Sequence, residues 1–478
     1  MNLGNVSVPT EAEADTLETV TDRIRTATMT AAAAAAVVLD LPEHSGQVRM
    51  ARRLASSHAG KLLHVHDVGW LAWAGTHWSA DDPGAPERAV LDVLRRALDE
   101  SIGDQQLQRD ARRCENASGI KGILNIAASL TDFATAVRHL DEDPYLLNTH
   151  NGTLNLRTFT LRPHNPADLC TKITGASWDA DASGTTWDDF LRQVLPDAGV
   201  RQFLQRVAGI GVIGKVIEHV LPILTGTGAN GKSTFYKAIC YALGDYAAIA
   251  EPNLFMHHPS AHPTGQMALL GRRWVVVSET EKGRPLAETT VKRLTGGDPI
   301  TARHMRQNFV TFNPSHTAVL VTNHLPKVSG DDAAIWRRLK VVPFEVVIPE
   351  KARNKRLDEQ LQQEADAVLA WAVAGYCDYV KCGGLADPGS VRQATGNYQR
   401  SSDVVARFID EACINHADAC ATTSTLHNRW REWARVEGVD DMSPRALGQA
   451  LDRLGYPAKK GAKGSRIRRG ICPGEDSA

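Results

Sequence analysis

A short segment, residues 221–235 with the sequence LPILTGTGANGKSTF, combines an apolar run with glycines, a lysine and hydroxyl residues. Its spacing G-x-x-x-x-G-K-S matches a phosphate-binding loop at every position. In such a loop the backbone N–H groups turn toward phosphate oxygens, the lysine reaches the outer phosphates and the serine hydroxyl holds Mg²⁺. We therefore expect ATP and Mg²⁺ as cofactors. The predicted ATP-binding residues are Gly226, Gly228, Asn230, Gly231, Lys232, Ser233 and Thr234.

Hydrolysis of a bound nucleotide needs an acid, and two acids follow the next apolar run. Residues 274–281, WVVVSETE, predict a buried strand that leads into Glu279 and Glu281. The carboxyl end of a strand in an open α/β sheet suits a metal contact and a base for water. Because alternate residues of an extended chain point to one side, both carboxylates are predicted to share one side of the strand end, and Glu279 is expected to hold the metal together with Ser233. The alternative for Glu281 is a solvated side chain.

A third apolar run, residues 316–326 with the sequence HTAVLVTNHLP, leads into Asn323. This amide can orient the attacking water or sense the outer phosphate; the alternative is a cap of the loop that follows. Further along, the segment DDAAIWRRLKVVPF carries Arg337 and Arg338. Each is either a surface cation or, in a ring of subunits, an arginine finger that reaches a neighbour's nucleotide.

The elements that must position these residues alternate between strand and helix patterns from residue 216 to about residue 348. This alternation predicts a sheet with crossover helices, and with the helical segment that follows, an α/β domain over residues 216–400. Residues 46–215 contain a tryptophan-rich hairpin, helices and an Asn-Gly hairpin, which predict a small α+β domain. Residues 1–45, polar and then alanine-rich, predict a flexible tail.

The last segment, residues 401–478, predicts three helices, the latter two with Thr or Ser caps, followed by a basic strand-turn-strand. This is the plan of a winged helix-turn-helix, so we expect it to bind duplex DNA. The alternative is a solvated charged face. The cations concerned are Lys459, Lys460, Lys463, Arg466, Arg468 and Arg469.

Composition narrows the class of protein. Hydrophobic residues make up 43% and charged residues 23% of the chain, and no run approaches the roughly 20 apolar residues of a membrane span. We expect a cytoplasmic protein of a bacterial or phage-infected cell, with no membrane partner. The formal net charge of -1 means that any DNA-binding surface is local. The first 60 residues are too short for a primase-polymerase domain, so we expect no primer synthesis, and a separate primase or polymerase is a candidate partner.

The order of the motifs GTGANGKST, SETE, LTGGDPITAR, VTNHLP and WRRLKVVPF resembles the superfamily 3 helicase domain of the phage and plasmid primase family, which is related to poxvirus D5-type primase-helicases. The resemblance implies an AAA+ P-loop ATPase core, preceded by a small α+β domain and followed by a winged-helix-like domain. It also implies a ring, usually hexameric, that moves along single-stranded DNA and separates the duplex.

The resemblance assigns roles by residue: phosphate binding to Lys232, the acidic strand-end position to Glu279, sensing to Asn323, and the finger to Arg337 or Arg338. One departure concerns the acids, because Thr280 separates two glutamates that are adjacent in several family members. The division of labour between the two glutamates therefore stays open. The segment that forms a DNA-contacting hairpin in the family contains Lys292, Arg303, His304 and Arg306.

We therefore expect an ATP-dependent DNA helicase of a phage, prophage or plasmid replication system, translocating on single-stranded DNA as a ring. The alternative is a DNA-binding replication-initiation or interference protein of a mobile element, whose ATPase drives assembly instead of unwinding. A small-molecule kinase is disfavoured, because the Trp-Arg-Arg segment and the basic tail have no use there.

Overall fold

A computed structural model of the 478-residue chain describes residues 44–256, 264–278, 284–303, 309–328, 332–460 and 466–474. The fold is mixed α/β, with a parallel sheet in the larger of two compact units. The first unit contains the described residues up to Leu140 together with Asn165–Thr171, and the second contains Asp141–His164 and the described residues from Lys172 onward. Within these ranges no helix is long and apolar enough to cross a membrane.

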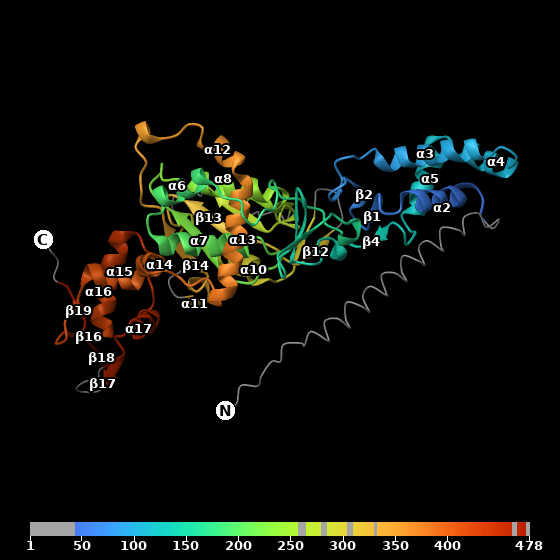
Figure 1. Ribbon diagram of the computed structural model, residues 1–478. Helices are drawn as coiled ribbons and strands as arrows, with labels where there is room; N and C mark the ends of the chain where they lie inside the picture. Colours follow the sequence, from blue (N-terminus) through green and yellow to red (C-terminus); the bar gives the residue numbers. More distant parts are fainter. Residues whose placement is uncertain are drawn as a thin grey trace, which may run out of the picture. The chain divides into compact units, whose positions relative to one another are not determined.

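The first unit packs four helices beside a small sheet (Figure 1). The sheet has the strand order β3-β2-β1-β4, and β1 pairs with β2 in the predicted tryptophan-rich hairpin, which is thereby confirmed. The helices bury an aliphatic core that contains Leu54, Val93 and Ile123. The elements are α2 (Gly46–His58), β1 (Leu62–Val65), β2 (Gly69–Trp73), β3 (Trp78–Ser79), α3 (Ala85–Glu100), α4 (Gln105–Cys114), α5 (Ala117–Ala127), β4 (Ala134–Thr135) and η1 (Val137–His139), with η2 (Pro166–Asp168) from the later segment.

The second unit is built on a five-stranded parallel sheet with the order β14-β8-β13-β10-β9. Successive side chains of a strand point to opposite faces, and here each face covers a separate apolar core. Because both faces are covered, β13 is buried at every residue, as expected for a parallel sheet. The strands are β8 (Leu221–Thr225), β9 (Ala247–Ala250), β10 (Trp274–Ser278), β13 (Thr317–Thr322) and β14 (Leu339–Pro343).

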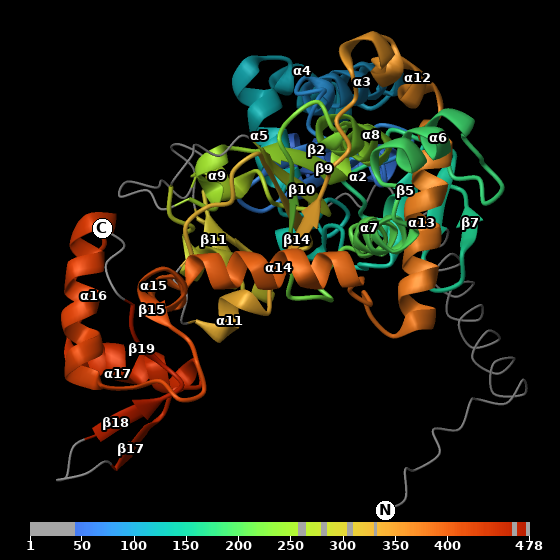
Figure 2. The same cartoon turned by 90° about the vertical axis from the view of Figure 1, so that its left-hand side faces the viewer.

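On one face of the sheet, the core includes helices that precede the sheet in the sequence and helices that follow it. On the other face, the core includes shorter elements and α14. Figure 2 shows α14 lying across β14, where Thr395 accepts a hydrogen bond from the backbone N–H of Val341 at 2.9 Å. The elements of the first core are α6 (Thr185–Val194), α7 (Ala198–Ile210), α8 (Lys232–Leu243), η3 (Gly244–Tyr246), α12 (Leu357–Gln363) and α13 (Ala365–Cys382). Around the second core lie η4 (Pro252–Leu254), α9 (Thr264–Met267), α10 (Glu288–Gly296), β11 (Ile300–Ala302), β12 (Val310–Phe312), α11 (Ala333–Trp336) and α14 (Gly389–Ser402), and η5 (Glu350–Ala352) precedes α12.

The compact units divide the chain at places other than the expected boundary at residue 215. Residues 172–215 belong to the unit that contains the parallel sheet, and α7 shares a core with that sheet. In this unit α7 lies side by side with α13 (Figures 1 and 2). Glycines allow this close approach: a Cβ on Gly209 would lie 2.2 Å from the backbone nitrogen of Tyr376, and a Cβ on Gly375 would lie 1.9 Å from the carbonyl oxygen of Gln205. The predicted Asn-Gly hairpin is confirmed and belongs to the same unit. Its sheet consists of β5 (Leu146–Thr149), β6 (Gly152–Asn155) and β7 (Thr160–Arg162).

The C-terminal segment has its own aromatic core around Phe408, Trp430 and Trp433. Its three helices are confirmed, and Thr422 and Ser443 cap α16 and α17 as predicted. The segment also contains a three-stranded antiparallel sheet with the order β16-β18-β17, and α16 contacts this sheet. The elements are α15 (Val404–Ala412), β15 (Cys413–Ile414), β16 (Cys420–Thr422), α16 (Thr423–Glu437), α17 (Pro444–Arg453), β17 (Ala458–Lys460), β18 (Arg466–Arg469) and β19 (Cys472–Pro473).

Candidate functional site

The glycine-rich loop connects the end of β8 to the start of α8. Its backbone enters the left-handed region at Gly228, Ala229 and Gly231, with φ of 108°, 50° and 85°. Gly231 also has no room for a side chain, because a Cβ would lie 2.6 Å from Cγ1 of Val194 on α6. The loop therefore turns back on itself and exposes the N-terminal N–H groups of α8, which favour a bound anion.

The side chain of Lys232 is held inside this loop by neutral oxygen atoms. Its ammonium donates hydrogen bonds to the carbonyl of Gly226 at 2.8 Å, to Oδ1 of Asn230 at 3.0 Å and to Oδ1 of Asn323 at 3.1 Å. Burial lowers the pKa of Lys232. In the described part of the chain no carboxylate pairs with this cation, so its charge is not neutralised by an acid there and favours an anionic ligand.

A cavity of about 270 Å³ opens beside Lys232, at the carboxyl ends of the neighbouring strands. Ser278, the last residue of β10, and Thr322, the last residue of β13, lie on its wall. Asn323 reaches Lys232 because β13 lies directly next to β8 in the sheet. The sequence-predicted residues that line this one cavity are Gly228, Asn230, Gly231, Lys232, Ser233, Thr234 and Asn323.

The remaining residues predicted around the nucleotide have other positions. Gly226 lies at the base of the loop, where its carbonyl accepts from Lys232. Asn230 donates from Nδ2 to the carbonyl of Phe344 at 3.0 Å, so its amide ties the loop to the end of β14. Glu279 and Glu281 follow Ser278 directly and lie outside the described residues.

The donor set of the cavity suits Mg²⁺ and a polyphosphate. Mg²⁺ is usually held by one or two protein oxygens, with phosphates and waters completing the octahedron. Ser233 lines the cavity, and its hydroxyl is an oxygen of the kind that can serve as such a ligand. The backbone N–H groups at the start of α8 and the Lys232 ammonium are suited to phosphate oxygens.

The two arginines considered as fingers differ in exposure. Arg337 is exposed, and its guanidinium has no hydrogen bond or ion pair among the described residues. Arg338 is partly buried and donates from Nη1 to the carbonyl of Ala334 at 2.9 Å. Of the two, Arg337 is therefore the one available to another molecule.

The predicted DNA-contacting segment is described only in part. Lys292 lies on α10 and forms an ion pair with Asp332, and this hydrogen bond holds the pKa of Asp332 below its usual range. Arg303 follows β11 and stacks over the ring of Phe309, with its Cζ 4.6 Å from the ring centroid. β11 and β12 pair antiparallel on either side of this point. His304 and Arg306 lie outside the described residues.

The basic strands of the C-terminal segment expose most of their cations, with one exception. Arg468, predicted as a DNA contact, is buried at 3% exposure. Its guanidinium donates to Asp452 at 2.6 Å, to the carbonyl of Gly448 at 2.9 Å, to the hydroxyl of Thr423 at 3.1 Å and to the carbonyl of Tyr456. The prediction for Arg468 is therefore wrong, because its charge is used within the fold. Lys463 lies outside the described residues, and the exposed cations are Lys459, Lys460, Arg466 and Arg469.

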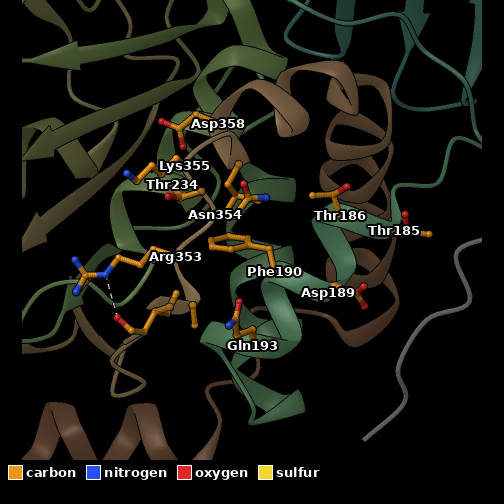
Figure 3. Close-up of a pocket in the computed structure, with 15 residues that line it drawn as sticks. Thr185, Thr186, Asp189, Phe190, Gln193, Thr234, Arg353, Asn354, Lys355 and Asp358 are labelled. Carbon is orange, nitrogen blue, oxygen red and sulfur yellow. Dashed lines mark hydrogen bonds between the residues drawn. The ribbon is translucent and has the colours of Figure 1, made fainter. Parts of the chain in front are cut away.

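A second cavity, of about 670 Å³, lies beside the glycine-rich loop (Figure 3). α6 and the segment around residues 352–358 form its walls. These residues were not predicted from the sequence, since no motif marks them. The available signal was the helical spacing of Thr186, Phe190 and Gln193, which places them on one face of α6.

Two family models match the chain. One, described as D5 N terminal like, matches residues 51–196, and the other, a family of unknown function (DUF5906), matches residues 224–338. A putative helicase of Acanthamoeba polyphaga mimivirus is 27% identical over 347 residues, which cover 67% of this chain and 36% of that protein. A putative helicase of Frog virus 3 is 28% identical over 289 residues, covering 55% and 29% of the two chains. A putative primase of African swine fever virus is 22% identical over 381 residues, covering 73% and 38%.

The chain thus spans about a third of the length of these curated relatives. Among solved structures, the apo C-terminal region of NrS-1 is similar over 61% of this chain and 78% of that chain, at 12% identity and a TM-score of 0.38, which is too low to define a shared fold. The fold and the site define an α/β protein in which a lysine-bearing loop follows the carboxyl end of a strand in a parallel sheet. Over residues 51–196 the chain resembles the D5 N terminal like family, and over longer stretches it is similar to viral proteins named putative helicase and putative primase.

Proposed function

We propose that the chain is an ATP-dependent DNA helicase of superfamily 3, with an AAA+ P-loop ATPase domain over residues 216–400. The observation that carries the proposal is the position of the Lys232 ammonium, inside the glycine-rich loop and 3.1 Å from Oδ1 of Asn323 on the adjoining strand. A loop, a cation and a polar strand end around one cavity are parts that nucleotide binding and hydrolysis use.

Each residue has a proposed task in that reaction. Lys232 neutralises the outer phosphates, and Ser233 holds Mg²⁺, which supplies further charge neutralisation when it is bound. Asn323 accepts from Lys232 and lies where it can also orient the attacking water. Glu279 is proposed as the base for that water from its place after β10, with Glu281 as the second acid.

DNA translocation is proposed to depend on a ring of subunits, usually six in this family. The exposure of Arg337 supports it as the finger that acts on a neighbour's nucleotide. Arg303 is proposed to contact single-stranded DNA. The C-terminal segment, proposed as a winged helix, presents exposed cations on β17 and β18 that suit the phosphates of duplex DNA.

The setting is proposed to be the replication of a phage, plasmid or virus genome, with a separate primase or polymerase as a partner. Relatives whose names are putative helicase and putative primase of DNA viruses support a replicative role. The second candidate is an initiation or interference protein whose ATPase drives assembly on DNA. The independent aromatic core of the C-terminal segment favours it, because a separately folded DNA-binding module also suits an initiator.

The test is a strand-displacement assay with ATP, run beside an ATPase assay with and without single-stranded DNA. The parental protein should unwind a forked duplex and hydrolyse ATP faster with DNA. Lys232→Ala should lose both activities, whereas the matched variant Lys381→Ala, at an exposed position at the end of α13, should keep them. ATP hydrolysis that DNA stimulates without any unwinding would support the initiator instead. Parental-level hydrolysis by Lys232→Ala would refute the ATPase assignment.

A further inference from the structure

The two cavities beside the glycine-rich loop share part of their walls. Ala229, Gly231 and Thr234 line both the cavity of about 270 Å³ around Lys232 and the cavity of about 670 Å³ next to α6. Small-molecule sites commonly enclose about 300–1,000 Å³. The larger cavity is therefore of a size for an organic group, whereas the smaller one suits a compact anion. A single ligand that passes over the loop would enter both.

One wall of the larger cavity is a single face of α6. Thr186, Phe190 and Gln193 lie on that face, and Figure 3 shows the ring of Phe190 projecting from α6 toward Asn354 and Thr234. Phe190 also abuts the loop, because its Cε2 lies 3.0 Å from the place of a Cβ on Gly231. An aromatic edge beside hydroxyl and amide groups is a surface that suits a flat heterocycle with polar edges.

The opposite wall is formed by residues 348–358, and most of its polar groups are already engaged. Arg353 turns away and donates to the carbonyl of Ile348 at 3.1 Å (Figure 3). Asn354 donates to Oε1 of Gln360 at 2.6 Å and accepts from the backbone N–H of Arg356 at 3.0 Å. These contacts give the wall its shape.

Gln193 differs from Asn354, the other side-chain amide of the cavity. It is exposed, and it has no hydrogen bond to any residue that the structure describes. A glutamine amide offers one donor and one acceptor side by side, which matches the adjacent amino group and ring nitrogen of adenine. The amide of Gln193 is therefore the group in this cavity with the chemistry to read a base.

We propose that the larger cavity binds the nucleoside of the nucleotide whose phosphates lie in the smaller cavity, and that Gln193 is the residue that selects adenine. The proposal rests on the proposed ATPase function and names the base-recognition part of that same site. It also assigns a function to α6, which ends about thirty residues before the loop begins and which lies within residues matched by a different family model from the loop.

The test measures binding with and without the base, using the full chain in the presence of Mg²⁺. ATP, GTP and inorganic tripolyphosphate are each titrated as competitors of a fluorescent ADP analogue. Gln193→Leu should weaken the affinity for ATP by about tenfold, which is in the lower part of the range for a bidentate base contact. The same variant should show a smaller preference for ATP over GTP. Its affinity for tripolyphosphate should not change, since that ligand has no base. Gln202→Leu, an exposed glutamine on α7, is the matched control and should leave all three affinities unchanged.

Each outcome separates the inference from the function on which it rests. If Gln193→Leu binds ATP as tightly as the parent, or loses ATP and tripolyphosphate equally, the base-recognition role is overturned while the phosphate site stands. If the parent binds neither ligand, the proposed function fails and the inference fails with it. Lys232→Ala should lose affinity for ATP and for tripolyphosphate together, which would show that both ligands bind at the glycine-rich loop.

Discussion

The buried guanidinium of Arg468 allows a structural role to be distinguished from DNA binding. We consider Arg468→Met, which keeps an unbranched apolar stem and removes only the charged group. The side chain is 3% exposed and connects β18 to Thr423 at the start of α16 and to Gly448 on α17. The change should therefore loosen the C-terminal segment as a whole.

The magnitude follows from the acceptors left behind. The carbonyls of Gly448 and Tyr456 would each lose a hydrogen bond from the guanidinium, and a hydrogen bond to a charged group contributes about 1.5–3 kcal/mol. The side chain of Asp452 is 51% exposed, so its carboxylate regains water and adds little. We expect a loss of about 3 kcal/mol, which corresponds to roughly a hundredfold change in an opening equilibrium.

Hydrogen exchange followed by mass spectrometry on the full chain measures this change. In Arg468→Met, amides of β16, β17 and β18 should exchange about a hundredfold faster than in the parent, in line with that free energy. Arg469→Met, on the same strand but exposed, should keep parental exchange and lose affinity for duplex DNA. Unchanged protection in Arg468→Met would refute the argument that its four hydrogen bonds hold the segment together.

The same contact predicts a dependence on pH. The hydrogen bond from Arg468 holds the pKa of Asp452 below its ordinary value of 3.8. A carboxylate with a lowered pKa in the folded state stabilises the fold above its unfolded pKa, and that contribution is lost as the pH falls through the folded pKa. Protection of β18 should therefore decline below about pH 4 in the parent, and the decline should be smaller in Arg468→Met. An equal decline in both proteins would contradict this assignment.

Three further predictions concern the glycine-rich loop and its neighbours. Gly231→Ala should reduce stability in urea unfolding by about 2–5 kcal/mol, from left-handed strain and overpacking, whereas Gly228→Ala meets open space and should lose only the strain part. Asn323→Asp should weaken ATP binding at least tenfold in a titration, because a carboxylate beside the ammonium would pair with it and repel phosphate; parental affinity would argue against the loop geometry. Arg337→Ala should be inactive alone, yet mixing it with Lys232→Ala should recover part of the ATPase activity, and no recovery would count against a shared site.

Residues whose local geometry depends on short-range spacing were predictable from the sequence. The glycine-rich loop is such a case, because its glycines, Lys232 and Ser233 are contiguous and their chemistry is set within ten residues. The apolar runs before Glu279 and Asn323 also predicted strands, and the structure confirms them as β10 and β13. The parallel sheet then brings Asn323 to Lys232, as the order of motifs implied.

Features that depend on contacts between distant segments were not predictable. Arg468 lies in a run of cations in which the alternation of a strand gives no sign of burial, since Arg466 on the same face is exposed. The exposure that separates Arg337 from Arg338 arises from the helical turn of α11, which brings Arg338 back onto Ala334. Similarly, the wall that α6 forms beside the loop exists only because Gly231 lets Val194 and the loop come together.

The close contact of α7 with α13 has a practical consequence for shortened forms of the protein. α7 falls between the two family matches, which end at residue 196 and begin at residue 224. A fragment chosen from either match would thus lack α7. It would therefore lack Phe203 and Leu204 of the shared core, and also Gly209, which packs against Tyr376. An expressed fragment that contains the parallel sheet should therefore begin before β5, near residue 141, so that the hairpin, α6 and α7 accompany the sheet they cover.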